Sequence, residues 1–73
     1  MNEKLLLIIN EIRENNNQPA IAELRPEMSL RTDIGFDSLS LAALTVMIED
    51  EFDVDVFEDG IVDSIEQILR KLE

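Results

Sequence analysis

The residues best placed for chemistry lie in the stretch Asp33-Ile34-Gly35-Phe36-Asp37-Ser38-Leu39, where a long connection meets an apolar segment with helical periodicity. Ser38 stands at the junction. Its hydroxyl can cap a helix by accepting a hydrogen bond from a backbone N–H group. A serine acting as a nucleophile needs a neighbouring base, and the chain contains no histidine. The Asp37-Ser38 pair alone therefore predicts a helix cap, and if the hydroxyl reacts, another protein must supply the base.

The residue inventory limits catalysis and metal binding. Without histidine or cysteine, the usual zinc ligands, the usual general base and a thiolate nucleophile are missing. A chain of 73 residues also leaves little room for a water-excluded pocket. The acidic residues that could bind calcium are Glu51, Asp53, Asp55, Glu58 and Asp59. Counted from Asp53, however, an EF-hand loop would need an oxygen ligand at Phe57 and a glycine at Glu58. We therefore predict no enzyme, no catalytic residue and no dedicated metal site.

The charge balance defines the expected partners. Six Lys and Arg against seventeen Asp and Glu give a formal net charge of −11, which disfavours nucleic acids and anionic membranes. Proteins with basic patches are the expected partners. The apolar run Leu5–Ile9 is too short for a signal peptide or a membrane span. We expect a cytoplasmic monomer without membrane insertion.

Helical periodicity appears in three segments. Residues 3–15, 38–51 (closed by Phe52) and 65–72 have apolar residues at helical spacing. The connection at 16–36 should pack across the core, with a helical turn near Ala20–Leu24. Residues 53–57 should form an extended connector, followed at 58–62 by a turn or a short helix. The sequence thus predicts an all-α single domain, residues 1–73. Its fold is a small antiparallel bundle of three main helices plus one short helix or turn, with a long first loop.

Two apolar faces are present on the second predicted helix, where a helix on one side of a bundle needs only one. The first comprises Leu41, Leu44, Thr45, Ile48 and Phe52. The second comprises Leu39, Ala42, Ala43 and Val46, with Glu49 and Asp50 flanking its far end. The second face is either a docking surface for a partner or buried by a third element.

The stretch 33–39 resembles the attachment motif of acyl carrier proteins, D-L-G-x-D-S-L, with Ile34 replacing leucine. The resemblance continues through Glu49-Asp50-Glu51-Phe52, similar to the family's E-E-E-F, and Asp53-Val54-Asp55-Val56, similar to its D-x-x-I. Chain length, helix order, the long first loop and the acidity also agree, so the resemblance covers essentially the whole chain.

The resemblance implies that Ser38 carries 4′-phosphopantetheine, attached covalently from coenzyme A by a Mg²⁺-dependent phosphopantetheinyl transferase. It also implies that Gly35 allows the turn that presents Ser38, and that Asp37 offers a carboxylate to the transferase. Leu39, Ala42 and Val46 match exposed recognition positions, with Glu49 and Asp50 beside them. The expected function is that of a discrete carrier holding acyl thioesters for acyl synthases, ligases or transferases with basic patches.

Some positions depart from the family's fatty-acid members. Ser40 and Ala43 stand where acids are usual, Phe57 replaces a common proline, and the segment before the last helix is shortened. These departures favour a polyketide-like or other specialised acyl pathway over fatty-acid synthesis, and Asp37 argues against a peptidyl carrier. Two alternatives remain: an aminoacyl (D-alanyl-type) carrier, and an acidic docking adaptor without a prosthetic group.

Overall fold

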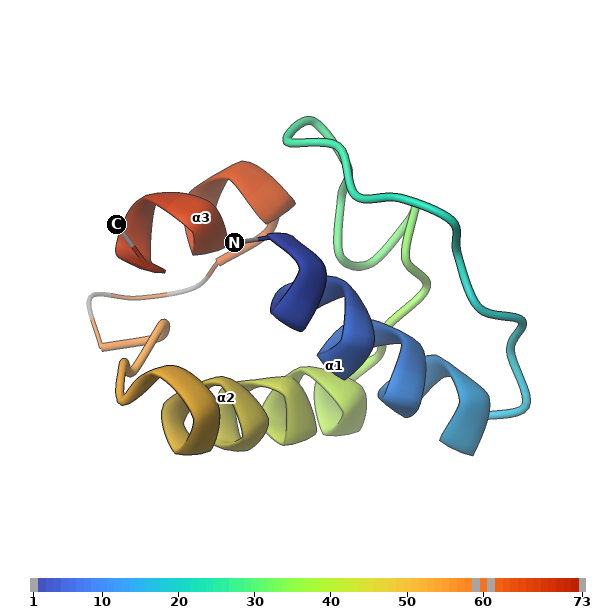
Figure 1. Cartoon of the computed structure of the whole chain (residues 1–73), viewed down its shortest axis with the longest axis horizontal. Coiled ribbons are helices and arrows are strands. Elements are labelled where there is room, and N and C mark those ends of the chain that lie inside the picture. Colours follow the sequence, from blue (N-terminus) through green and yellow to red (C-terminus); the bar gives the residue numbers. More distant parts are fainter. Residues whose placement is uncertain (1, 59, 61, 73) are drawn as a thin grey trace.

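Three helices make up the regular structure of the computed structural model, which describes residues 2–58, 60 and 62–72 (Figure 1). They are α1 (Asn2–Asn15), α2 (Ser38–Phe52) and α3 (Ile65–Leu72). α1 packs against α2 and runs in the opposite direction, and side chains from all three helices share one core. The predicted small all-α bundle is confirmed.

The apolar stripe of α1 is buried, as its spacing predicts. Its residues are Leu5, Ile8, Ile9 and Ile12. The helix ends because Asn17 takes the left-handed conformation, with a φ of 63°, which asparagine tolerates better than most residues. Asn17 N then donates to Glu14 O at 3.1 Å, and Gln18 N donates to Arg13 O at 2.8 Å. This is the hydrogen-bond pattern of a Schellman motif.

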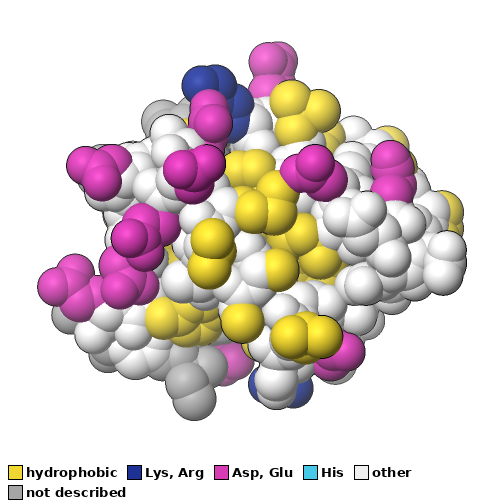
Figure 2. All heavy atoms as spheres, turned by 90° about the horizontal axis from the view of Figure 1, so that it is seen from below, with side chains coloured by type: hydrophobic (Ala, Val, Ile, Leu, Met, Phe, Trp, Pro, Cys, Tyr) yellow, Lys and Arg dark blue, Asp and Glu magenta, His cyan; other side chains and the backbone are white. Residues whose placement is uncertain are grey.

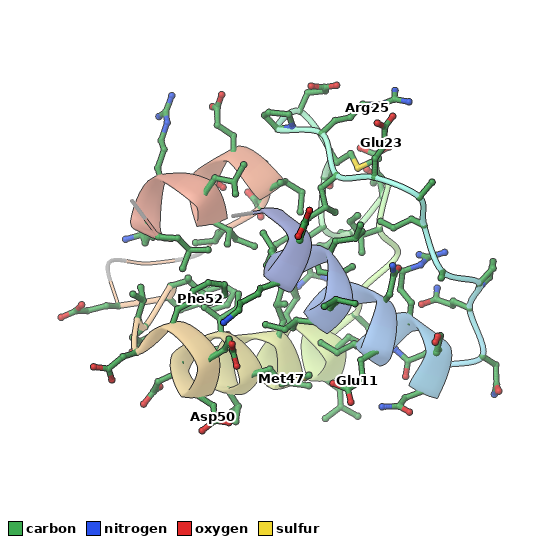
Figure 3. The ribbon with its side chains drawn as sticks, in the orientation of Figure 1. Glu11, Glu23, Arg25, Met47, Asp50 and Phe52 are labelled. Atoms are coloured by element: carbon green, nitrogen blue, oxygen red, sulfur yellow. The ribbon has the colours of Figure 1, made fainter. Side chains whose placement is uncertain are left out.

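α2 turns one face toward the core. Its buried residues are Ser40, Leu41, Leu44 and Ile48, and Thr45 and Phe52 are half-buried. The predicted inner face is therefore confirmed, with Ser40 as an unexpected polar addition. Phe52 points into the space between α2 and α3, whereas Asp50 points away from the rest of the protein (Figure 3). The helix ends where Asp53, with a φ of 58°, donates its N–H to Glu49 O at 2.8 Å.

The long connection between α1 and α2 crosses the core without forming a helical turn near Ala20–Leu24, so that prediction is wrong. Asn10 on α1 is the reason. Its side chain accepts a hydrogen bond from Ile21 N at 2.8 Å and donates one to Ile21 O at 3.0 Å. These bonds use the two backbone groups that a helical turn would need. The connection turns later instead, at residues 26–27 and 30–33.

Backbone hydrogen bonds join this connection to the start of α3. Leu30 N donates to Asp63 O at 2.8 Å, and Ile65 N donates to Met28 O at 3.0 Å. A capping box begins α3: Ser64 Oγ accepts from Gln67 N at 3.3 Å, and Gln67 Oε1 accepts from Ser64 N at 3.1 Å. Ser64 is therefore the N-cap of α3. The start of α3 is thereby fixed to the connection that leads into α2.

The segment between α2 and α3 inserts two valines into the core. Val56 is fully buried and Val54 is half-buried. Residues 54–55 form neither helix nor strand, and the chain turns at 56–58, within the segment that the sequence predicted to be an extended connector. The turn or short helix expected at 58–62 falls partly on residues 59 and 61, which lie outside the described residues.

Candidate functional site

The turn before α2 is held by two buried side chains on either side of a glycine. Ile34 is 0% exposed and Phe36 is 2% exposed. Gly35 between them has a φ of 83°, and a Cβ there would lie 3.0 Å from Gln18 Nε2. Both the backbone conformation and the space therefore favour glycine. Asp33 Oδ2 closes the preceding turn by accepting from Ser29 N at 2.7 Å.

Polar side chains at the C-terminal end of α1 and just after it form hydrogen bonds with this turn and with the first turn of α2. Arg13 donates to the Ile34 carbonyl, and its Nε donates to Pro19 O at 2.9 Å. Asn16 Nδ2 donates to Ser40 Oγ at 2.8 Å, which gives the buried Ser40 hydroxyl a partner. We did not predict the contacts with Ile34 and Ser40, because each joins residues more than twenty positions apart in the chain and has no local sequence pattern.

Asp37, not Ser38, is the N-cap of α2. Its Oδ1 accepts from Ser40 N at 2.8 Å, with an extended backbone at Asp37 (φ −93°, ψ −175°). This corrects the prediction that the Ser38 hydroxyl caps the helix. Aspartate caps at least as well as serine, and its negative charge also interacts favourably with the helix N-terminus. The Ser38 hydroxyl is consequently not used in capping.

Replacing Asp37 with alanine is expected to lower the melting temperature by a few degrees, and replacing it with asparagine by less. The hydrogen bond from the Ser40 N–H holds the pKa of Asp37 below the usual 3.8. A lowered pKa in the folded state means that this carboxylate stabilises fully above its unfolded pKa, and that the contribution is lost as pH falls through the folded value. Thermal unfolding of wild type and Asp37→Asn should be measured from pH 7 down to about pH 3. We expect the difference between their melting temperatures to become smaller as the pH falls. A pH-independent difference would contradict the assigned cap.

Ser38 is the first residue of α2 and is exposed. Arg31 Nη2, from the turn at 30–33, lies 3.5 Å from Ser38 Oγ. An open apolar hollow of about 400 Å³ lies beside the hydroxyl, lined by Ser38, Leu41, Ala42, Thr45 and Phe57. Another molecule can therefore reach this hydroxyl.

The second apolar face of α2 is open to solvent. Leu39 is 81% exposed and Val46 is 66% exposed, and Ala42 and Ala43 are exposed too. Hydrophobic side chains gather on the face of the molecule seen from below, with acidic side chains along one margin (Figure 2). Glu49, Asp50 and Val46 line one hollow of this surface, at the far end of α2. Of the two interpretations of this face, burial by a third element is wrong for the described residues.

The comparisons with known proteins identify the family. The family described as "Phosphopantetheine attachment site" matches residues 6–70. The acyl carrier protein of Desulforapulum autotrophicum is 39% identical over 57 residues, which cover 70% of this chain and 74% of that protein. No solved structure gave a significant match. The chain therefore belongs to the acyl carrier protein family of phosphopantetheine-binding domains, as its resemblance predicted.

Family membership establishes the general role. The chain is a carrier rather than an enzyme, and its prosthetic group is covalently bound 4′-phosphopantetheine. Carriers of this family work with phosphopantetheinyl transferases and acyl-handling enzymes. Among the described residues, no helix is long and apolar enough to cross a membrane.

Proposed function

We propose that Ser38 is the residue that carries 4′-phosphopantetheine. The observation that carries this proposal is its accessibility, which the other serines lack. Ser40 is buried and bonded to Asn16, and Ser29 and Ser64 are half-buried where the long connection joins α3. Ser38 alone among the four serines is exposed, and it follows a turn that Ile34 and Phe36 anchor in the core.

The attachment chemistry assigns a passive role to this chain. Ser38 Oγ forms a bond to the phosphorus of coenzyme A that bears the pantetheine arm. The bond between that phosphorus and the bridging oxygen of the diphosphate breaks, and the adenine nucleotide departs with this oxygen and the electron pair. The transferase takes the hydroxyl proton, since this chain has no histidine or cysteine. Asp37 remains exposed while it caps α2, so its carboxylate can still contact a basic group on the transferase.

The prosthetic group supplies the thiol that the polypeptide lacks, and it holds an acyl group as a thioester near each partner's active site at high effective concentration. The residues that surround the attachment point fit this use. Ser38 is the first residue of α2, a position from which a long tether can leave the protein. The apolar hollow lined by Leu41, Ala42 and Phe57 lies beside it.

We propose that partner enzymes dock on the exposed face of α2 formed by Leu39, Ala42 and Val46. An exposed apolar group next to a reactive tether is a typical recognition surface, and large apolar side chains at its centre should carry most of the binding energy. Glu49 and Asp50 are exposed at the far end of the same helix, where they can meet a basic patch on the partner.

Val46→Glu is expected to slow loading by the transferase or by an acyl-handling partner about tenfold, while the melting temperature changes little. The apolar contact would be lost, but Val46 makes little contribution to the core at 66% exposure. Leu7→Glu is the matched control, because Leu7 is 70% exposed on α1. Equal rates for the two variants would contradict docking on α2, and a large fall in stability for Val46→Glu would place this residue in the core.

We further propose that residues 1–73 form one monomeric carrier domain that works in the cytoplasm in a polyketide-like or other specialised acyl pathway. Ser40 and Ala43 support this specialisation. They leave the first turns of α2 without the acids that fatty-acid members usually carry, and Ser40 is bonded to Asn16, just after α1, instead of facing a partner. Loading assays with acyl and D-alanyl ligases would show whether the carried group is an acyl group or an aminoacyl group.

The attachment is tested by incubating the protein with coenzyme A and a broadly specific phosphopantetheinyl transferase, followed by intact mass measurement. We expect the mass of one phosphopantetheine to be added. No gain would contradict the proposal and would favour a docking adaptor.

A further inference from the structure

Arg31 is the cation closest to the proposed attachment point, and its turn holds it there. Its Nη2 lies 3.5 Å from Ser38 Oγ. The turn at 30–33 is anchored by the fully buried Leu30, by Asp33 N donating to Ser29 O at 3.0 Å, and by Ser29 N donating to Asp33 Oδ2 at 2.7 Å. The backbone at Arg31 is therefore fixed beside the start of α2.

The guanidinium of Arg31 retains capacity for another partner. A separation of 3.5 Å is long for a hydrogen bond, and guanidinium has five N–H donors. Arg31 forms no ion pair with the described residues, although the whole chain has a formal net charge of −11. Three other cations do form such pairs: Lys4 with Glu51, Arg25 with Glu23, and Arg70 with Glu66.

An anion attached to Ser38 would enter an acidic environment. Asp37 immediately precedes it with an exposed carboxylate, and a phosphodiester adds a further negative charge. Arginine binds phosphate oxygens through paired, charge-assisted hydrogen bonds that are stronger than bonds to a neutral hydroxyl. The guanidinium that now reaches Ser38 Oγ would thus gain a better acceptor and offset the repulsion from Asp37.

We infer that Arg31 binds the phosphodiester that joins the prosthetic arm to Ser38, and so fixes the direction in which the arm leaves α2. This inference rests on the proposed attachment at Ser38. It gives Arg31 a positioning role toward the carried group, separate from the docking face formed by Leu39, Ala42 and Val46.

The test compares Arg31→Gln with Arg25→Gln, each in its unloaded and loaded forms. Both variants remove one positive charge from the same connection, but Arg25 is paired with Glu23 at 3.2 Å in a remote part of the loop (Figure 3). Intact mass first verifies loading of every protein, so that failure of the wild type to load would be recognised as failure of the proposed function. Loaded proteins are then studied by ³¹P NMR and thermal unfolding.

We expect the ³¹P resonance of loaded Arg31→Gln to differ from that of wild type, and added salt to move the wild-type resonance toward the variant's. Loading should lower the melting temperature of Arg31→Gln by a few degrees more than that of wild type. Arg25→Gln should resemble wild type in both measurements. Equal behaviour of the two loaded variants would overturn the inference, as would an equal loss of stability in loaded and unloaded Arg31→Gln.

Discussion

Replacing Ser38 with alanine is expected to abolish the mass gain on incubation with coenzyme A and a phosphopantetheinyl transferase. Alanine removes the only exposed serine hydroxyl and leaves the cap intact, because Asp37 makes the capping hydrogen bond to Ser40 N. The melting temperature should therefore stay within a few degrees of the wild-type value. Intact mass measures the loading, and circular dichroism measures the unfolding.

Ser40→Ala is the matched control for that experiment. Its hydroxyl is buried and bonded to Asn16 at 2.8 Å, so its loss should destabilise the fold by about 1 kcal/mol without preventing loading. A wild-type mass gain in Ser38→Ala would contradict the proposed attachment point. Loss of loading in folded Ser40→Ala would indicate that the accessibility argument had selected the wrong serine.

Replacing Ile34 with alanine is expected to have the largest effect on stability. Ile34 is fully buried, and truncating such a side chain costs about 2–5 kcal/mol. The free energy of unfolding of a domain of this size is at the low end of the usual range, which is about 5–15 kcal/mol. We therefore expect a fall of at least 10 °C or so in the melting temperature. Thermal unfolding followed by circular dichroism measures it.

Leu39→Ala is the control for Ile34→Ala, since it also shortens an aliphatic side chain in the same motif. Leu39 is 81% exposed, so its stability change should stay within about 0.5 kcal/mol. Its effect should instead be on docking. Similar destabilisation by the two substitutions would mean that the motif's apolar residues are not divided between the core and the surface as the structure shows.

Much of the fold followed from periodicity. The apolar stripe of α1 and the inner face of α2 are local patterns with helical spacing, and the three helices begin and end within one residue of the predicted positions. The opposite face of α2 was also predictable, because helical geometry alone separates Leu39 and Val46 from Leu41 and Leu44.

The remaining features depend on contacts between distant residues. No local pattern shows that Asn10 binds both backbone groups of Ile21, which prevents the expected helical turn. The same holds for Asn16, whose contact with Ser40 explains a buried serine on α2. Asp37 and Ser38 are both good capping residues, so sequence alone could not decide between them. That choice matters for function, because the cap formed by Asp37 leaves the Ser38 hydroxyl outside the capping hydrogen bonds.

The most direct test of the account is to locate the modified residue in loaded wild-type protein. The protein is digested after loading, and fragmentation mass spectrometry assigns the phosphopantetheine to one side chain. We predict that the group is on Ser38 alone. Assignment to Ser29, Ser40, Ser64 or any other residue would contradict the account.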